Sequence, residues 1–121
     1  MPKYDRIAKM NHERRFPDDP LMFIRRCIEQ RKIFWTYHVN MRLKGRSISR
    51  ETIISSRNSF EIIEKYPEDR YFPSYLLFSV YRGEIFHVLC ATDVEGDNIR
   101  IITAYRPNPE EWEADLKTRR R

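Results

Sequence analysis

The sequence predicts an α+β fold in which N-terminal helices pack on one face of an antiparallel sheet of about four strands, and a short helix ends the chain. Helical periodicity and capping signals are confined to residues 19–58, and four segments rich in β-branched and aromatic residues follow from residue 59. With 121 residues, of which 40% are hydrophobic, the chain suits one compact domain. Helices followed by strands are typical of a sheet whose second face is free for a ligand.

The first 18 residues differ from the rest, because they are polar and basic with little periodicity. They predict an N-terminal arm, residues 1–18, ahead of a single α+β domain, residues 19–121. The domain begins with a helix, since Asp19 is a favourable N-cap and Pro20 suits the first helical position. The stripe of this helix that we expect to face the core contains Leu21, Ile24, Cys27, Ile28 and Lys32.

Two shorter helices are predicted next. Residues 34–44 indicate a short extended piece that passes into a second helix, which ends near Gly45. Ser49 is the predicted N-cap of a third helix. The helical half of the chain ends there.

The second half of the chain predicts an antiparallel meander. Its strands are expected at residues 59–66, 74–81, 84–93 and 98–105, with turn residues at 82–83 and 95–98. Pro67 and Pro73 bracket the loop before the second of these strands. Pro107 and Pro109 end the last strand and open the expected terminal helix at residues 110–121.

The composition favours a polyanionic partner and gives no sign of a metal or a membrane. Lys and Arg number 23 against 18 Asp and Glu, for a net charge of +5, which suits RNA, DNA or an acidic protein and also ordinary solubility. Cys27 and Cys90 stand outside any zinc-ligand spacing, so we expect two buried thiols and no metal or cofactor. Because we find no signal peptide or membrane span, we expect a cytoplasmic protein.

A basic row in the second helix is the first candidate site. His38, Arg42 and Arg46 are spaced four residues apart, so they would share one helix face if the helix continues past Gly45. Like charges gathered in this way repel unless an anion joins them, and guanidinium groups match phosphate oxygens. The alternative is a solvated helix face on which His38 makes a local hydrogen bond.

His87 is the second candidate, in the middle of the third predicted strand. Alternation in the last strand places Thr103 and Tyr105 on one face with Ile99 and Ile101. A two-residue turn would set His87 opposite Arg106, and a loop one residue longer would set it beside Tyr105. A lone histidine on such a face is also a common core residue.

These residue types suit the cleavage of RNA without a metal. Imidazoles can carry protons, arginines can hold phosphate, and hydroxyl groups can assist attack by the ribose 2′-OH. The sequence contains none of the common motifs of NTP hydrolysis, serine hydrolysis or zinc peptidase chemistry.

Three motifs in order carry a resemblance to a known family. The stretches "HVNMRLKGRSIS", "HVLCATD" and "IITAYRPNPEEW" resemble the signatures of a family of small bacterial proteins with a domain of unknown function, over about residues 34–112. That family is similar to the RelE-like ribonuclease toxins of toxin-antitoxin systems. Their fold is one or two N-terminal helices on a curved antiparallel sheet of about four strands, which agrees with the α+β prediction.

The resemblance implies a metal-independent mRNA endoribonuclease, active on free or ribosome-bound mRNA and held in check by a cognate antitoxin protein. It implies that RNA binds the basic concave face of the sheet. The implied catalytic residues are His38, Arg42, Arg46, His87 and Tyr105, and the implied substrate-binding residue is Thr103. Arg106 is a second substrate-binding candidate because of its expected position opposite His87. Two alternatives stay open: a non-catalytic module that binds RNA or a protein with the same face, and a domain that binds a small phosphorylated ligand.

Overall fold

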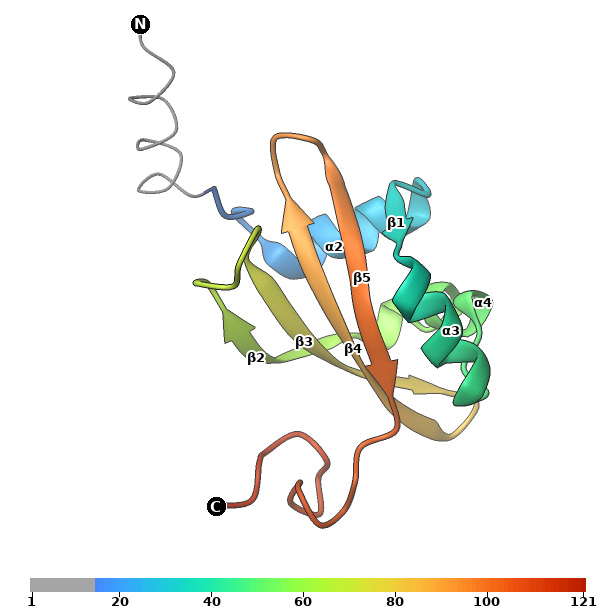
Figure 1. Ribbon diagram of the computed structural model, residues 1–121. Helices are drawn as coiled ribbons and strands as arrows, with labels where there is room; N and C mark the ends of the chain where they lie inside the picture. Colours follow the sequence, from blue (N-terminus) through green and yellow to red (C-terminus); the bar gives the residue numbers. More distant parts are fainter. Residues whose placement is uncertain (1–14) are drawn as a thin grey trace, which may run out of the picture.

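The computed structural model describes residues 15–121, so most of the predicted N-terminal arm lies outside the described residues (Figure 1). Helices precede strands along this part of the chain, apart from one short early strand. The elements are α2 (Pro20–Glu29), β1 (Ile33–Trp35), α3 (Tyr37–Gly45), α4 (Arg50–Ser55), the 3-10 helix η1 (Arg57–Ser59), β2 (Glu61–Tyr66), β3 (Ser74–Tyr81), β4 (Glu84–Asp93) and β5 (Asn98–Tyr105). The predicted α+β class is therefore confirmed.

The strands form one sheet in the order β1-β5-β4-β3-β2. β2 to β5 are an antiparallel meander, as expected from the turn signals. β1 adds a fifth strand, which pairs in parallel with β5 and aligns Phe34 with Arg100. The extended piece predicted before the second helix is thus part of the sheet and carries the chain from α2 to α3 along the edge of β5 (Figure 1).

Each α-helix begins where a side chain can accept a hydrogen bond from the backbone N–H three residues ahead. Asp19, Thr36 and Ser49 do this for α2, α3 and α4, at 3.1, 3.1 and 3.0 Å. The N-caps predicted at Asp19 and Ser49 are confirmed. Arg46 is the C-cap of α3, so the helix ends at the predicted place.

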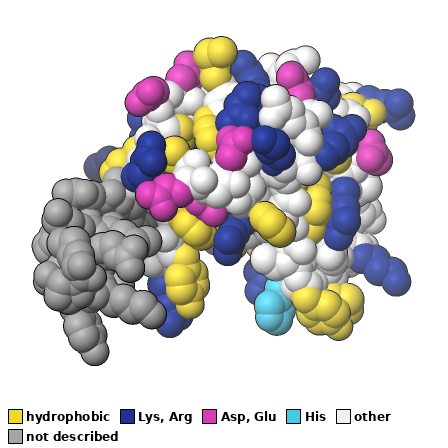
Figure 2. All heavy atoms as spheres, turned by 90° about the horizontal axis from the view of Figure 1, so that it is seen from above, with side chains coloured by type: hydrophobic (Ala, Val, Ile, Leu, Met, Phe, Trp, Pro, Cys, Tyr) yellow, Lys and Arg dark blue, Asp and Glu magenta, His cyan; other side chains and the backbone are white. Residues whose placement is uncertain are grey.

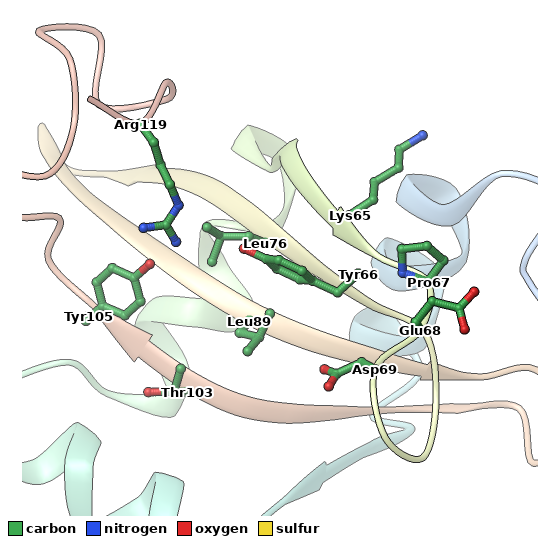
Figure 3. Close-up of a pocket in the computed structure, with 10 residues that line it drawn as sticks. All are labelled: Lys65, Tyr66, Pro67, Glu68, Asp69, Leu76, Leu89, Thr103, Tyr105 and Arg119. Carbon is green, nitrogen blue, oxygen red and sulfur yellow. The ribbon is translucent and has the colours of Figure 1, made fainter. Parts of the chain in front are cut away.

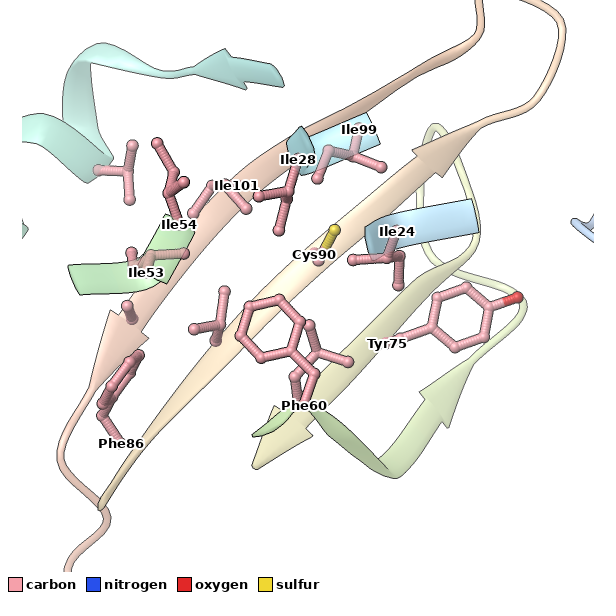
Figure 4. Packing of buried hydrophobic residues seen from close by; sticks show 14 of the residues in the cluster. Ile24, Ile28, Ile53, Ile54, Phe60, Tyr75, Phe86, Cys90, Ile99 and Ile101 are labelled. Atoms are coloured by element: carbon pink, nitrogen blue, oxygen red, sulfur yellow. The ribbon is translucent and has the colours of Figure 1, made fainter. Parts of the chain in front are cut away.

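The hydrophobic core lies between the helices and one face of the sheet. Figure 4 shows isoleucines of α2 and α4 packed against β4 and β5. The buried residues of the core include Ile24, Cys27, Ile28, Val39, Leu43, Ile53, Ile54, Phe60, Tyr75, Leu77, Phe86, Val88, Cys90, Ile99, Ile101 and Ala104. Both cysteines are free buried thiols, as predicted, and burial raises the pKa of each.

A β-bulge in β5 changes which residues share a face. Leu89 pairs with Thr103 but Cys90 pairs with Ile101, so Ile102 is an extra residue. Ile101 and, after the bulge, Ala104 face the helices. The prediction that Thr103 and Tyr105 share a face with Ile99 and Ile101 is therefore wrong, because it assumed unbroken alternation.

We call the sheet face turned away from this core the outer face. It is defined by residues that alternate with the core residues along the strands. They are Phe34, Tyr66, Ser74, Leu76, Phe78, His87, Leu89, Ala91, Arg100, Thr103 and Tyr105.

The prediction of a helix at residues 110–121 is wrong. The segment forms turns with an isolated bridge between Trp112 and Arg119. Asp115 accepts hydrogen bonds from the backbone N–H groups of Lys117 and Thr118, at 2.8 and 3.1 Å, and Leu116 has φ 58°. An aspartate that bonds the chain just ahead of it competes with helix formation. The segment instead folds back over the outer face.

Candidate functional site

His87 is completely buried between the outer face and the C-terminal segment. Its Nε2 lies 2.7 Å from the carbonyl oxygen of Leu116, and the ring of Trp112 meets it edge-on at 4.6 Å between centroids. Burial lowers the pKa of the imidazole, so the neutral ring can donate its Nε2 proton to that carbonyl. His87 has no open path to a ligand here, and this geometry supports a packing role.

Tyr105 is the cross-strand partner of His87, which is the pairing predicted for a loop one residue longer than two. The structure reaches this pairing in another way, through a four-residue loop at residues 94–97 together with the bulge at Ile102. Its hydroxyl lies 3.4 Å from His87 Nδ1. Burial raises the pKa of Tyr105, so at neutral pH its phenol is protonated and can donate a hydrogen bond.

A pocket of about 550 Å³ opens beside Tyr105 on the outer face (Figure 3). Leu76 and Leu89 form an apolar floor, and Arg119 enters from the C-terminal segment toward Tyr105 (Figure 3). Lys65 extends away from the other side chains (Figure 3). The lining residues are Lys65, Tyr66, Pro67, Glu68, Asp69, Leu76, Leu89, Thr103, Tyr105 and Arg119.

A carboxylate holds two of the polar groups in place at this pocket. Glu64 lies on β2, where its Oε2 accepts a 2.8 Å hydrogen bond from Arg119 Nε, and its Oε1 accepts one from the hydroxyl of Tyr66. Burial raises the pKa of Tyr66, and the hydrogen bond to Glu64 raises it further by a smaller amount. The Tyr66 hydroxyl proton and the Arg119 Nε proton are thus given to Glu64, so the donors that the pocket can offer an anion are the terminal nitrogens of Arg119 and the Tyr105 hydroxyl.

Arg46 reaches the rim of this pocket from the end of α3. Its Nη1 donates to Thr103 Oγ1 at 3.2 Å and to the carbonyl oxygen of Ala104 at 2.7 Å. Arg106 donates to the carbonyl oxygen of Arg46 and pairs with Glu84 at 3.0 Å. The structure thus brings Arg46 and Thr103 together. The Arg106 side chain instead bonds to Arg46 and Glu84, outside the pocket.

His38 and Arg42 lie apart from the pocket, on the exposed side of α3. Within residues 15–121 neither side chain has a hydrogen-bond or ion-pair partner, and His38 contacts the ring of Tyr37 at 6.1 Å between centroids. Eight residues of helix rise about 12 Å, so His38 is roughly two turns from Arg46. The structure therefore divides the predicted site among α3, the pocket and the buried His87.

In residues 15–121, no three His, Cys, Asp or Glu side chains are grouped so as to hold a metal ion. Over the same residues, no helix has the length and apolar character to span a membrane.

Comparison with known proteins identifies the family of the chain. Residues 35–106 match a domain of unknown function, DUF4258. The chain belongs to this family. No curated protein and no solved structure gives a match. All the site residues predicted from the sequence lie inside the DUF4258 segment, but Arg119 and Trp112 follow it.

Sequence reasoning missed Glu64, Tyr66 and Arg119. Glu64 and Tyr66 stand two residues apart in a predicted strand of the DUF4258 domain, so alternation could have placed them on one face. No local signal could have placed Arg119, because the last residues were expected to form a helix. Its position depends on the fold of the C-terminal segment.

Proposed function

We propose that this DUF4258 protein is a metal-independent endoribonuclease that binds single-stranded RNA on the outer face of its sheet. One observation carries the proposal: Arg119 and the hydroxyls of Tyr66, Tyr105 and Thr103 line one open pocket on that face. The resemblance to RelE-like toxins supports it, since helices on one face and an RNA site on the other are what that resemblance implies.

The chemistry is an attack of the ribose 2′-oxygen on the adjacent phosphorus, in which the 2′ proton passes to a carboxylate of the pocket such as Glu68. The 5′-oxygen of the next nucleotide leaves, so the products are a 2′,3′-cyclic phosphate and a 5′-hydroxyl. In this proposal Arg119 stabilises the charge that develops on the phosphoryl oxygens, and Tyr105 donates a proton to the leaving oxygen. A raised phenol pKa suits this role, because the proton stays on Tyr105 until an alkoxide forms.

The basic row on α3, formed by His38, Arg42 and Arg46, would guide the RNA toward the pocket. Arg42 is an exposed cation without an ion-pair partner in residues 15–121, and Arg46 contacts Thr103 at the pocket rim. Figure 2, seen from above, shows Lys and Arg side chains on the side away from the grey residues, with hydrophobic and some acidic side chains between them. Such a surface suits the phosphates and bases of a single strand.

A non-catalytic RNA-binding module is the second candidate. The observation in its favour is that neither described imidazole lines the pocket, because His87 is buried and His38 lies on α3. A nuclease at this pocket would need a carboxylate, such as Glu68 or Asp69, to accept the 2′ proton.

As a toxin, the protein would also have a cognate antitoxin that blocks the outer face.

The decisive experiment incubates purified protein with single-stranded RNA in EDTA. We expect cleavage that leaves 2′,3′-cyclic phosphate ends. Tyr105→Phe keeps the ring and removes the proton, so it should lower the single-turnover rate by roughly 10²-fold, the usual scale for a lost general acid. Arg119→Ala should lower the cleavage rate more than the RNA affinity, because in this proposal Arg119 stabilises charge that develops in the transition state. Arg121→Ala is the matched control, because Arg121 is an exposed arginine two residues away.

Intact RNA after long incubation, together with measurable RNA binding, would reject the nuclease and retain the binding module. Failure of the wild-type protein to bind RNA would reject both candidates. Growth arrest on induction without an antitoxin, which is relieved by Tyr105→Phe, would support the role as a toxin.

A further inference from the structure

An arginine contacts two aromatic rings at the other end of the outer face. The guanidinium carbon of Arg100 is 4.7 Å from the ring centroid of Phe72 and 5.6 Å from that of Phe34. Phe34 lies on β1, Arg100 on β5, and Phe72 in the loop between β2 and β3. Three separate segments therefore bring these side chains to one place.

Phe34 is not needed in the hydrophobic core. The neighbouring residues Ile33 and Trp35 turn toward the helices and pack against the core, while the side chain of Phe34 is 58% exposed on the outer face. The Arg100 side chain is 44% exposed, so the guanidinium and the ring of Phe34 both remain accessible. The exposed ring of Phe34 therefore lies next to an accessible guanidinium group and a second aromatic ring, Phe72.

The charge and shape of this group favour one kind of ligand. Arg100 has an acidic neighbour, Asp93, at 3.9 Å, but that carboxylate also accepts hydrogen bonds from Gly96 N and Asn98 Nδ2 within its own turn. Flat rings and a guanidinium plane stack on nucleobases, and the positive charge attracts the phosphates that link them.

We propose that Phe34, Arg100 and Phe72 form a stacking platform for the bases of single-stranded RNA. This inference rests on the proposed function, because it takes RNA as the ligand of the outer face. Arg100 is three residues before Thr103 on β5, so the stacking platform lies at most about 10 Å along the strand from the pocket. Bases held there would set the position of the strand that enters the pocket.

The test compares binding of a labelled 2′-O-methyl oligoadenylate with that of an abasic oligomer of equal length. The 2′-O-methyl group prevents attack by the 2′-oxygen, so binding is measured without cleavage. Phe34→Ala should weaken binding of the oligoadenylate by roughly 5-fold to 100-fold and leave the abasic oligomer unchanged. Phe34→Trp should retain affinity. Met22→Ala is the control, since Met22 is an exposed apolar residue on α2, which packs on the other side of the sheet.

Melting curves would verify that each variant is folded. Equal affinities of wild type and Phe34→Ala for the oligoadenylate would overturn the stacking platform, and so would equal losses on both oligomers. If unmodified RNA were still cleaved in those cases, the proposed nuclease would stand without the platform. Base-dependent binding through Phe34 without cleavage would support the platform and reject the nuclease. A wild-type protein that binds neither oligomer would overturn the platform and the RNA site together.

Discussion

Replacing His87 and His38 separately by alanine tests which histidine is structural. His87→Ala removes the 2.7 Å hydrogen bond to the carbonyl of Leu116 and leaves a hole beneath Trp112. An unpaired buried carbonyl costs about 1–3 kcal/mol, and the lost packing adds to it, so we expect a loss of about 2–4 kcal/mol. In a chain of this size the melting temperature should fall by roughly 10 °C.

His38→Ala provides the matched comparison because His38 is exposed and has no hydrogen-bond partner within residues 15–121. Its free energy of unfolding should change by less than about 0.5 kcal/mol. Urea denaturation of both variants gives the two values, and RNA affinity per folded molecule is measured alongside. A His87→Ala variant that keeps wild-type stability but loses cleavage would refute the packing role and restore His87 to the active site.

The remaining predictions concern pH. Because burial lowers the folded pKa of His87 below its unfolded value of 6.5, the unfolded state binds more protons below pH 6.5, and stability should fall there by at most about 1.4 kcal/mol per pH unit. Urea denaturation at pH 7.5 and 5.5 would reveal this slope, and His87→Gln should flatten it; an unchanged slope would contradict the assignment. Asp97 has its pKa lowered to about 2 by hydrogen bonds from Arg26 and then Lys32, so its stabilisation is present above pH 4 and lost as the pH falls toward 2. Asp97→Asn should therefore lower the melting temperature at pH 7 and have little effect at pH 2, and equal effects at both values would count against the ion pairs.

The helix starts and the meander could be predicted because their causes are local. Asp19 and Ser49 each satisfy a backbone N–H three residues ahead, and this interaction is visible in the sequence as a capping residue before an apolar stripe. The four long strands also have alternating patterns and turn residues between them. The short strand β1 is different, because its three residues depend on β5 to complete their hydrogen bonds.

The site was harder to predict because its parts meet through tertiary structure. The bulge at Ile102 moves Thr103 and Tyr105 to the outer face, and no glycine or proline marks its position. Arg119 joins the pocket only because the chain after Pro109 turns back instead of forming a helix. Spacing along the sequence could therefore indicate the candidate residue types but not their grouping.

The C-terminal segment has two opposite effects on the outer face. Through Trp112 and Leu116 it buries His87, which removes an imidazole from contact with solvent. Through Arg119 it adds a guanidinium that is held by Glu64 at the pocket. Both effects come from the same few residues, so they are linked: a conformation that frees His87 must also displace Arg119. A nuclease built on this surface can use the guanidinium together with phenols and carboxylates, or it can use the imidazole, but it cannot use both in one arrangement of the segment.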